Sequence, residues 1–222
     1  MAGRVSVAAV LIVTAFAVIR LRADDERLKH AASALTEMSS GGELGISRDF
    51  FAKAKCIVII PSVRKAALGF GGQYGRGYVS CRNATGSGWS APGGVRIEGG
   101  SVGLQIGASE TDVILLVLND RGADRLLSSR FTVGADAGVA AGPVGRQASA
   151  QTDATLTAEI LAWSRTRGVY AGLALQGSTL REDSDENRQI YGAERANKEI
   201  VRGTIDPPRG AAPLMASLAK LP

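Results

Sequence analysis

The most constraining stretch of this sequence is GFGGQYGRGY, residues 69–78. Most of its glycines fall on odd positions, so that in a β-strand they share one face. The other face carries the large side chains Phe70, Tyr74, Arg76 and Tyr78. Glycine weakens the interior of a strand, and such a strand needs a compensating structural reason. The pattern predicts a strongly curved sheet, or a sheet with another element packed directly on its backbone.

The same alternation of glycine with apolar residues recurs around 99–107, 134–142 and 168–175. Glycine accounts for 28 of the 222 residues and aromatic residues for only 5%, so close backbone packing must supply much of the core. Cys56 to Ile60 reads as a buried strand that stops at Pro61, and further strands are expected at 112–118 and 155–163. The fold class that we predict is α+β, with a curved, mostly antiparallel, glycine-rich sheet and a few flanking helices.

Several segments have helical periodicity. An apolar stripe with i, i+3, i+4, i+7 spacing predicts an amphipathic helix over 28–38, ended by Gly41-Gly42. A short helix from Ser47 to about Lys55 and others around 123–127 and 186–200 are also expected. The segment from Gly203 to the end is rich in proline and small residues and is predicted to be a flexible tail over 203–222.

The first residues have the pattern of an export signal. Arg4 precedes an apolar run from Val5 to Ile19, which is short for a membrane-spanning helix and suits the core of a signal peptide. The sequence predicts a signal over 1–23, cleaved after Ala17 or Ala23, or retained as an uncleaved anchor. One domain over 24–202 follows, and the protein is expected to be exported and periplasmic or peripheral on the envelope membrane.

Positive charge is concentrated in one region. Removing Arg4, Arg20 and Arg22 lowers the formal charge from +5 to +2, because three basic residues are lost. Residues 48–96 carry eight basic residues against Asp49 alone, a net charge of +7. Such a region suggests an anionic surface as partner if folding gathers its charges; scattered, solvated charges are the alternative.

Few residues suggest catalysis or metal binding. The chain has one histidine, His30, and no motif pairs Glu98, Asp112 or Asp136 with an activating base. The spacing of acidic residues from Asp183 to Glu194 resembles a calcium loop, but Arg188 occupies the position that requires glycine. An acidic helix start explains the same residues. We predict no enzyme activity, metal, cofactor or nucleic-acid partner; an uncharacterised hydrolase stays as a third alternative.

The state of the two cysteines, Cys56 and Cys81, has two possible interpretations. In an exported chain they could pair, and the closed loop would stabilise the fold by about 3.5 kcal/mol in the loop-entropy model. Two buried free thiols on separate strands are the alternative.

Several of these stretches together resemble the SYLF-domain family. They include Gly69–Tyr78, the block Gly88-Trp89-Ser90-Ala91-Pro92, and the block Ala141-Gly142-Pro143-Val144-Gly145-Arg146. The resemblance covers about residues 26–202. It implies a lipid-binding module, since eukaryotic relatives are associated with phosphoinositides and actin structures, and it implies no catalysis.

The function that we expect is phospholipid binding at an anionic membrane surface of the cell envelope. The alternative is an envelope structural or protein-interaction module with a protein partner. We hypothesise that the membrane contact needs both the short helix near 47–55 and the pair Arg64-Lys65, brought together by the fold. Phe50 or Phe51 would insert into the membrane unless both are core residues. The full set of candidate contact residues is Arg48, Phe50, Phe51, Lys53, Lys55, Arg64 and Lys65.

Overall fold

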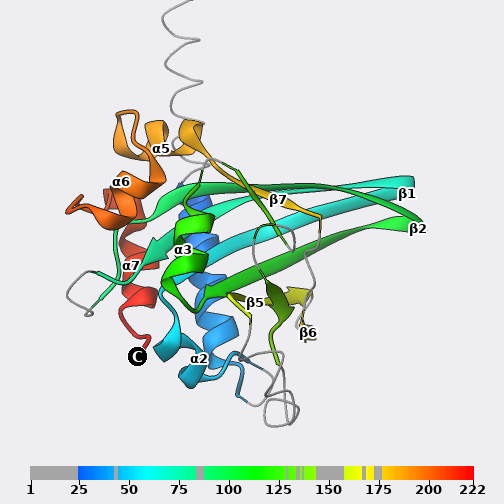
Figure 1. Ribbon diagram of the computed structural model, residues 1–222, viewed down its shortest axis with the longest axis horizontal. Coiled ribbons are helices and arrows are strands. Elements are labelled where there is room, and N and C mark those ends of the chain that lie inside the picture. The colour runs from blue at the N-terminus through cyan, green and yellow to red at the C-terminus, as the bar shows by residue number, and fades with distance from the viewer. Residues whose placement is uncertain are drawn as a thin grey trace, which may run out of the picture.

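The protein's structure is a computed structural model that describes residues 25–42, 45–83, 88–128, 130–133, 136, 138–143, 158–166, 169–172 and 177–222. A curled, mostly antiparallel sheet with helices packed around one end confirms the α+β class (Figure 1). The expected signal over 1–23 lies outside the described residues. The described elements are a helix over 25–40, α2 (Arg48–Lys53), β1 (Cys56–Cys81), β2 (Gly93–Val117), α3 (Asp120–Leu126), β3 (Phe131–Thr132), β4 (Val139–Ala141), β5 (Ile160–Thr166), β6 (Val169–Gly172), β7 (Thr179–Glu182), α5 (Ser184–Tyr191), α6 (Asn197–Arg202), the 3-10 turn η3 (Arg209–Ala211) and α7 (Ala212–Leu218).

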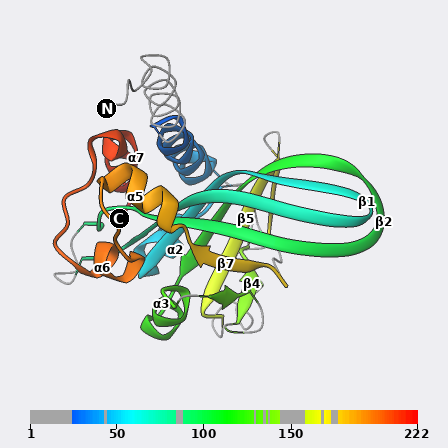
Figure 2. The same ribbon diagram turned by 90° about the horizontal axis from the view of Figure 1, so that it is seen from above.

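β1 and β2 form one long antiparallel ribbon that folds back on itself (Figure 2). The two strands pair from Cys56 opposite Val117 to Val79 opposite Gly93. The register shifts at two points along this length. Because the ribbon bends back, the two ends of β1 meet: Cys56 and Cys81 form a disulfide, and the Arg82 N–H donates to the Lys55 carbonyl at 2.8 Å. β1 therefore curves so strongly that its first and last residues lie side by side.

The glycines of β1 make this close return possible. A Cβ on Gly77 would lie 2.1 Å from the Ile59 carbonyl oxygen, and one on Gly75 would lie 2.9 Å from the Ile60 side chain. Another part of β1 therefore packs directly on the backbone of these two glycines, as the alternation predicts. Not every glycine has this role, since a Cβ on Gly100 would meet nothing within 4 Å. Gly134 and Gly168, in two of the recurring patterns, lie outside the described residues.

The prediction that the first strand stops at Pro61 is wrong. The register shifts between Ile60 and Val63, so that Pro61 and Ser62 lie in a bulge. Ser62 has a positive φ of 57°, and its N–H donates to the Asp112 carboxylate at 3.0 Å. The bulge leaves proline out of the ladder of paired residues, and the strand continues past it.

β2 is the centre of the sheet. Among the described strands the order is β3-β7-β2-β5-β4, with β1 paired to β2 and β6 paired to β5. β7 pairs with the first part of β2 at Val95–Glu98, and β5 pairs with its last part at Asp112–Val117. β4 and β5 are parallel, and the other pairs are antiparallel. This order confirms the strand expected at 112–118 and, from Ile160 on, the one expected at 155–163.

Both faces of the sheet are buried near the helical end of the molecule. One face packs its side chains with α3 and α6. The other is covered by the helix over 25–40, α2 and α7, which lie together on one side of the sheet. The predicted stripe of the first helix is confirmed, because all of its members are buried in this cluster: Leu28, Ala31, Ala32, Leu35 and Met38.

The carboxyl-terminal part differs from the prediction in two ways. The helix expected at 186–200 is two helices, α5 and α6, separated at Gly192, which has a left-handed φ of 68°. The segment over 203–222, expected to be a flexible tail, contains η3 and α7. Ala211, Leu214 and Leu218 are at most 1% exposed and pack in the cluster of the first helix. Apolar residues at helical spacing therefore outweigh the prolines, and one proline lies in the first turn of α7, where it is tolerated.

Candidate functional site

The basic residues of the short helix point outwards. α2 follows Ser47 and presents Arg48 and Lys53 to solvent, and Lys55 is exposed directly after it. No ion pair involves these three side chains among the described residues. α2 and its end therefore carry three solvated positive charges, with Asp49 as the acidic residue of the first turn.

The two phenylalanines of α2 have packing roles. Phe51 is 1% exposed and lies in the core cluster beneath the helix. Phe50 is half-buried, and its ring centroid lies 5.5 Å from that of Trp163 in a tilted arrangement. The structure therefore takes Phe51 out of the candidate contact and supports the core alternative for it.

Arg64 and Lys65 do not join the α2 charges. They lie on β1 beyond the bulge, nine and ten residues after Lys55. At the rise of an extended strand, nine residues span at most about 30 Å. Arg64 also stands opposite Glu110 in the register. The structure thus places the candidate residues on two elements, α2 with its end and the ribbon beyond the bulge.

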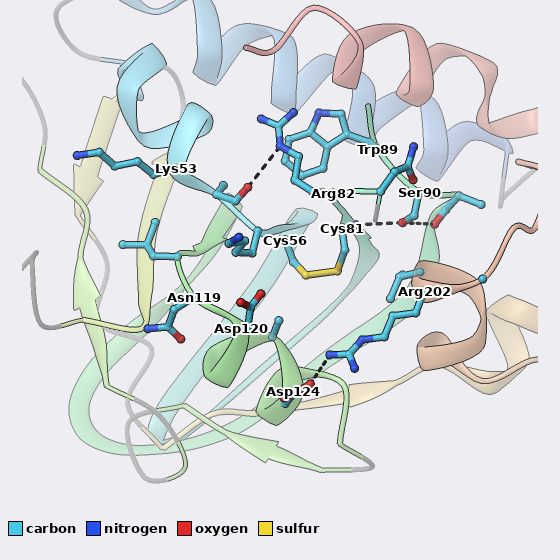
Figure 3. A pocket seen from close by; sticks show the side chains of 18 of the residues that line it. Lys53, Cys56, Cys81, Arg82, Trp89, Ser90, Asn119, Asp120, Asp124 and Arg202 are labelled. Atoms are coloured by element: carbon cyan, nitrogen blue, oxygen red, sulfur yellow. Dashed lines mark hydrogen bonds and ion pairs between the residues drawn. A yellow bond between two sulfur atoms is a disulfide. The ribbon is translucent and has the colours of Figure 1, made fainter. Parts of the chain in front are cut away.

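An open cleft of about 1810 Å³ lies beside α2 (Figure 3). Its lining includes Lys53, Lys55, Arg82, Trp89 and the Cys56–Cys81 disulfide. On the opposite side, Arg202 of α6 forms an ion pair with Asp124 of α3. The cleft therefore combines apolar, basic and acidic groups and shows no strong preference for one charge.

Arg82 fixes the end of α2 at this cleft. Its guanidinium donates to the carbonyls of Phe51 at 3.1 Å and Ala54 at 3.4 Å, and its Cζ lies 4.1 Å from the centroid of the Trp89 ring. Cations at a helix carboxyl terminus and over an aromatic face are both stabilising. Burial lowers the pKa of Arg82 from its ordinary value, although far too little to discharge it at neutral pH.

A buried ionic network links three elements at the other end of the helical side. The Glu186 carboxylate, almost inaccessible, accepts from Arg27 and the Tyr78 hydroxyl, and Arg76 lies 3.3 Å away. Arg76 also donates to Asp183 at 2.5 Å. Burial, followed by the charge of Glu186, raises the pKa of Tyr78 well above its usual range, so that its hydroxyl remains a donor.

The sequence pattern indicates one part of this ionic network, the helix start at Asp183, and does not indicate the rest. Asp183 begins the stretch that resembles a calcium loop, and the structure confirms the helix-start alternative: its carboxylate caps α5 by accepting from the Glu186 N–H at 3.2 Å. No group of His, Cys, Asp or Glu that could hold a metal occurs in the described part of the chain. Tyr78 and Arg76 stood out as the large face of the glycine-rich strand, but nothing local connects them to Glu186.

The carboxylates considered for catalysis have structural partners. Asp112 accepts from Ser62 and from Arg165, the latter at 2.6 Å. Glu98 lies 3.1 Å from Arg96, and Asp136 accepts from the Thr132 N–H at 2.5 Å. His30, the single histidine, is exposed on the first helix. These groups do not form an acid–base pair in the geometry described here.

Comparison with known proteins identifies the family. A family model described as Ysc84, Las17-binding protein actin regulator, matches residues 98–221, more than half of the chain. The chain belongs to the Ysc84 (SYLF) family. The SH3 domain-containing protein PJ696.02 of Schizosaccharomyces pombe is 35% identical over 178 residues, which are 78% of this chain and 41% of that protein. LAS seventeen-binding protein 3 of Saccharomyces cerevisiae is 34% identical over 182 residues, 80% of this chain and 39% of its own length.

A human member of the Ysc84 family, SH3 domain-containing YSC84-like protein 1, is 30% identical over 194 residues, 86% of this chain and 56% of that protein. The chain thus spans about two fifths of the yeast relatives and just over half of the human one. What is shared is the Ysc84 domain and not the whole length of these proteins.

Two of the blocks on which the family resemblance rests have structural roles in this Ysc84 domain, although residues 144–146 of the second block lie outside the described residues. In the block that starts at Gly88, Ser90 Oγ accepts from the Cys81 N–H at 3.0 Å, so that the block closes the turn between β1 and β2. Gly142 lies flat against Trp163, because a Cβ there would be 2.0 Å from the ring, and Trp163 Nε1 donates to the Pro143 carbonyl at 3.1 Å. Both tryptophans are buried and pack in the core cluster beneath the helices.

No helix within the described residues of this Ysc84 domain has both the length and the apolar character needed to cross a membrane.

Proposed function

We propose that this chain is a non-enzymatic module that binds the surface of an anionic phospholipid membrane. The observation that carries the proposal is the group of exposed charges on and after α2: Arg48, Lys53 and Lys55 have no ion pair within the described structure. By contrast, arginines such as Arg76 and Arg165 are held by carboxylates. Charges without an internal partner keep their full attraction for an external anionic surface.

The expected binding is weak and sensitive to salt. Each basic residue near an anionic membrane contributes about 1 kcal/mol, so that three residues supply roughly 3 kcal/mol. Phe51 is buried and Phe50 packs on Trp163, and the contact is therefore electrostatic without insertion of either ring. Arg64 and Lys65 belong to the ribbon and not to α2, and the proposed contact does not include them.

We also propose that the chain is exported. Two features support this: the apolar run from Val5 to Ile19, which has the length of a signal core, and the Cys56–Cys81 disulfide, since disulfides persist in oxidising compartments. Mass mapping of the protein isolated from its native cell would test both points. Loss of the first residues and an absence of alkylatable thiols before reduction are expected; a full-length chain with two free thiols would contradict the proposal.

The membrane contact is tested by vesicle flotation at low salt. The parent protein should float with phosphatidylcholine vesicles that contain phosphatidylserine and not with phosphatidylcholine alone. The double variant Lys53→Gln, Lys55→Gln should lose most of this flotation, whereas the matched variant Arg64→Gln, Lys65→Gln should retain it. Equal flotation of the parent and the α2 variant would show that α2 is not the contact.

A second candidate is a protein-interaction module, with a partner protein in place of the membrane. The names of several relatives favour it, because they refer to binding of Las17 or to SH3 domains, and an open cleft of about 1810 Å³ beside α2 offers a surface. Crosslinking in the native envelope separates the two candidates. A protein adduct captured through the cleft, from a chain that does not float with anionic vesicles, would favour this second function.

A further inference from the structure

A second cavity lies where the ribbon meets the start of α5. It has a volume of about 480 Å³, within the range of cavities that hold small ligands. Tyr74 and Arg76 of β1 line it from one face of the ribbon, because they are two residues apart, and Arg96 of β2 joins them through its pairing with Arg76. The side of α5 that completes the lining has i, i+3, i+4 spacing and consists of Asp185, Arg188 and Gln189.

The charges of this cavity are compensated within the protein. Each of its three arginines has a carboxylate nearby: Arg76 lies 2.5 Å from Asp183, Arg96 lies 3.1 Å from Glu98, and Arg188 lies 3.5 Å from Asp185. The charge of Arg96 acts on Asp183 as well. The cavity therefore does not require an anion. It offers guanidinium donors and carboxylate acceptors close together, and such a lining suits a neutral ligand with many polar groups.

Two lining side chains keep their polar groups available. Neither the Tyr74 hydroxyl nor the Gln189 amide forms a hydrogen bond with another residue that the structure describes. Tyr74 is also 49% exposed, and it is the one exposed large hydrophobic side chain in the described part of the chain. A half-exposed aromatic ring thus stands at a cavity whose other lining residues are all polar or charged.

We infer that this cavity binds a neutral saccharide of one or two sugar rings. A pyranose ring has a flat face of C–H groups, which would stack on the Tyr74 ring, and a rim of hydroxyl groups. Each hydroxyl both donates and accepts, so that one hydroxyl can donate to Asp185 and accept from Arg188 or Gln189. A wholly apolar ligand would leave the charged lining without partners, and an anion would compete with ion pairs that already exist.

The saccharide site shares no residue with the contact proposed for α2 and does not depend on it. Its residues come from the ribbon and from α5, together with Asp183 directly before that helix. The double variant Lys53→Gln, Lys55→Gln should therefore bind saccharide like the parent. Failure of the membrane contact would leave this site in place, and the reverse also holds.

The test is titration of the full chain with cellobiose, lactose and N,N′-diacetylchitobiose, followed by amide shifts in nuclear magnetic resonance spectra. At least one of these disaccharides should bind with millimolar affinity. Sorbitol, an acyclic polyol that has hydroxyl groups and no flat ring face, should bind at least about tenfold more weakly than that disaccharide. This comparison separates recognition of the ring from general hydrogen bonding to hydroxyl groups.

Variants of the two available side chains assign the site. Tyr74→Ala should bind the disaccharide at least about tenfold more weakly, whereas Tyr74→Phe keeps the ring and should stay within about threefold of the parent. Gln189→Ala should also bind more weakly, and Lys198→Ala, at an exposed residue of α6 outside the cavity, should bind like the parent. Thermal midpoints close to that of the parent will show that the variants fold. The inference is overturned if none of the three disaccharides binds, if sorbitol binds as well as they do, or if Tyr74→Ala binds as tightly as the parent.

Discussion

Single residues decide how closely the folded ribbon can return on itself, and Gly77 is the tightest such position among the glycines of β1 whose contacts the structure describes. A methyl group there would lie 2.1 Å from a backbone oxygen of Ile59, which cannot rotate away as a side chain could. We expect Gly77→Ala to lower the free energy of unfolding by about 1–3 kcal/mol, the usual range for overpacking. Urea unfolding measures this loss.

Gly100→Ala is the matched control, because a Cβ at Gly100 meets nothing within 4 Å. It should leave the stability nearly unchanged. Equal effects of the two substitutions would mean that the destabilisation comes from the strand conformation of alanine and not from the contact with Ile59.

The charge of Asp183 gives the stability of the fold a defined dependence on pH. Burial alone would raise the pKa of this carboxyl, but the hydrogen bond and charge of Arg76 outweigh burial and hold the pKa below its ordinary value. A lowered pKa in the folded state means that the stabilisation is fully present above the unfolded pKa, about 3.9, and is lost as the pH falls through the folded value. Asp183 thus contributes at neutral pH and not in strong acid.

We therefore expect Asp183→Asn to be less stable than the parent at pH 7, and the difference to shrink below about pH 4. Chemical unfolding over this pH range provides the measurement. Asp185→Asn, which alters an exposed residue of the same helix, should show a small difference at every pH. A gap between parent and Asp183→Asn that widens in acid would contradict the assigned direction of the pKa.

At the scale of elements, α7 shows where local composition is a poor guide. Its prolines and small residues favour a flexible tail, yet Leu214 and Leu218 are buried against the first helix. Leu214→Ala should lower the free energy of unfolding by about 2–4 kcal/mol. Met215→Ala changes a half-buried neighbour and should have a clearly smaller effect. If thermal melts of both variants match the parent, the segment contributes nothing to the fold.

The sequence is a good guide to elements that depend on local pattern and a poor one to those that depend on distant partners. The stripe from Leu28 to Met38 and the alternation of glycine around Gly77 each predict the element that forms. The continuation of β1 through Pro61 could not be predicted, because the bulge depends on Asp112, far along the chain. The pairing of Cys56 with Cys81 stayed open for the same reason: it requires the ribbon to fold back.

In the candidate site, too, features that depend on local pattern are predictable and features that depend on distant partners are not. Exposed basic residues on α2 were predictable from composition, since charged side chains rarely lie in a core. The separation of Arg64 and Lys65 from them depends on the path of β1, and the burial of Phe51 depends on the covering face of the sheet. The alignment of Arg76, Arg96 and Arg181 is invisible in sequence, because they become neighbours only through the register of three strands.

At the scale of the whole molecule, Glu186 joins parts of the chain that are far apart in sequence. Its carboxylate accepts from Arg27 of the first helix and from Tyr78 of β1, and it belongs to α5. It is one of the least accessible carboxylates in the described structure. Removing one partner of a buried ion pair leaves the remaining charges without compensation, which typically destabilises a protein by about 3–5 kcal/mol.

We expect Glu186→Gln to lower the free energy of unfolding by about 3–5 kcal/mol. The loss of stability should be measurable in more than one element. Amide hydrogen exchange should show reduced protection in both the helix over 25–40 and α5, because the lost charge held Arg27 and Arg76 together. Glu194→Gln, at an exposed residue 3.6 Å from Arg188, is the control and should change neither helix. Loss of protection confined to α5 would show that the carboxylate only stabilises its own helix and does not link it to the helix over 25–40.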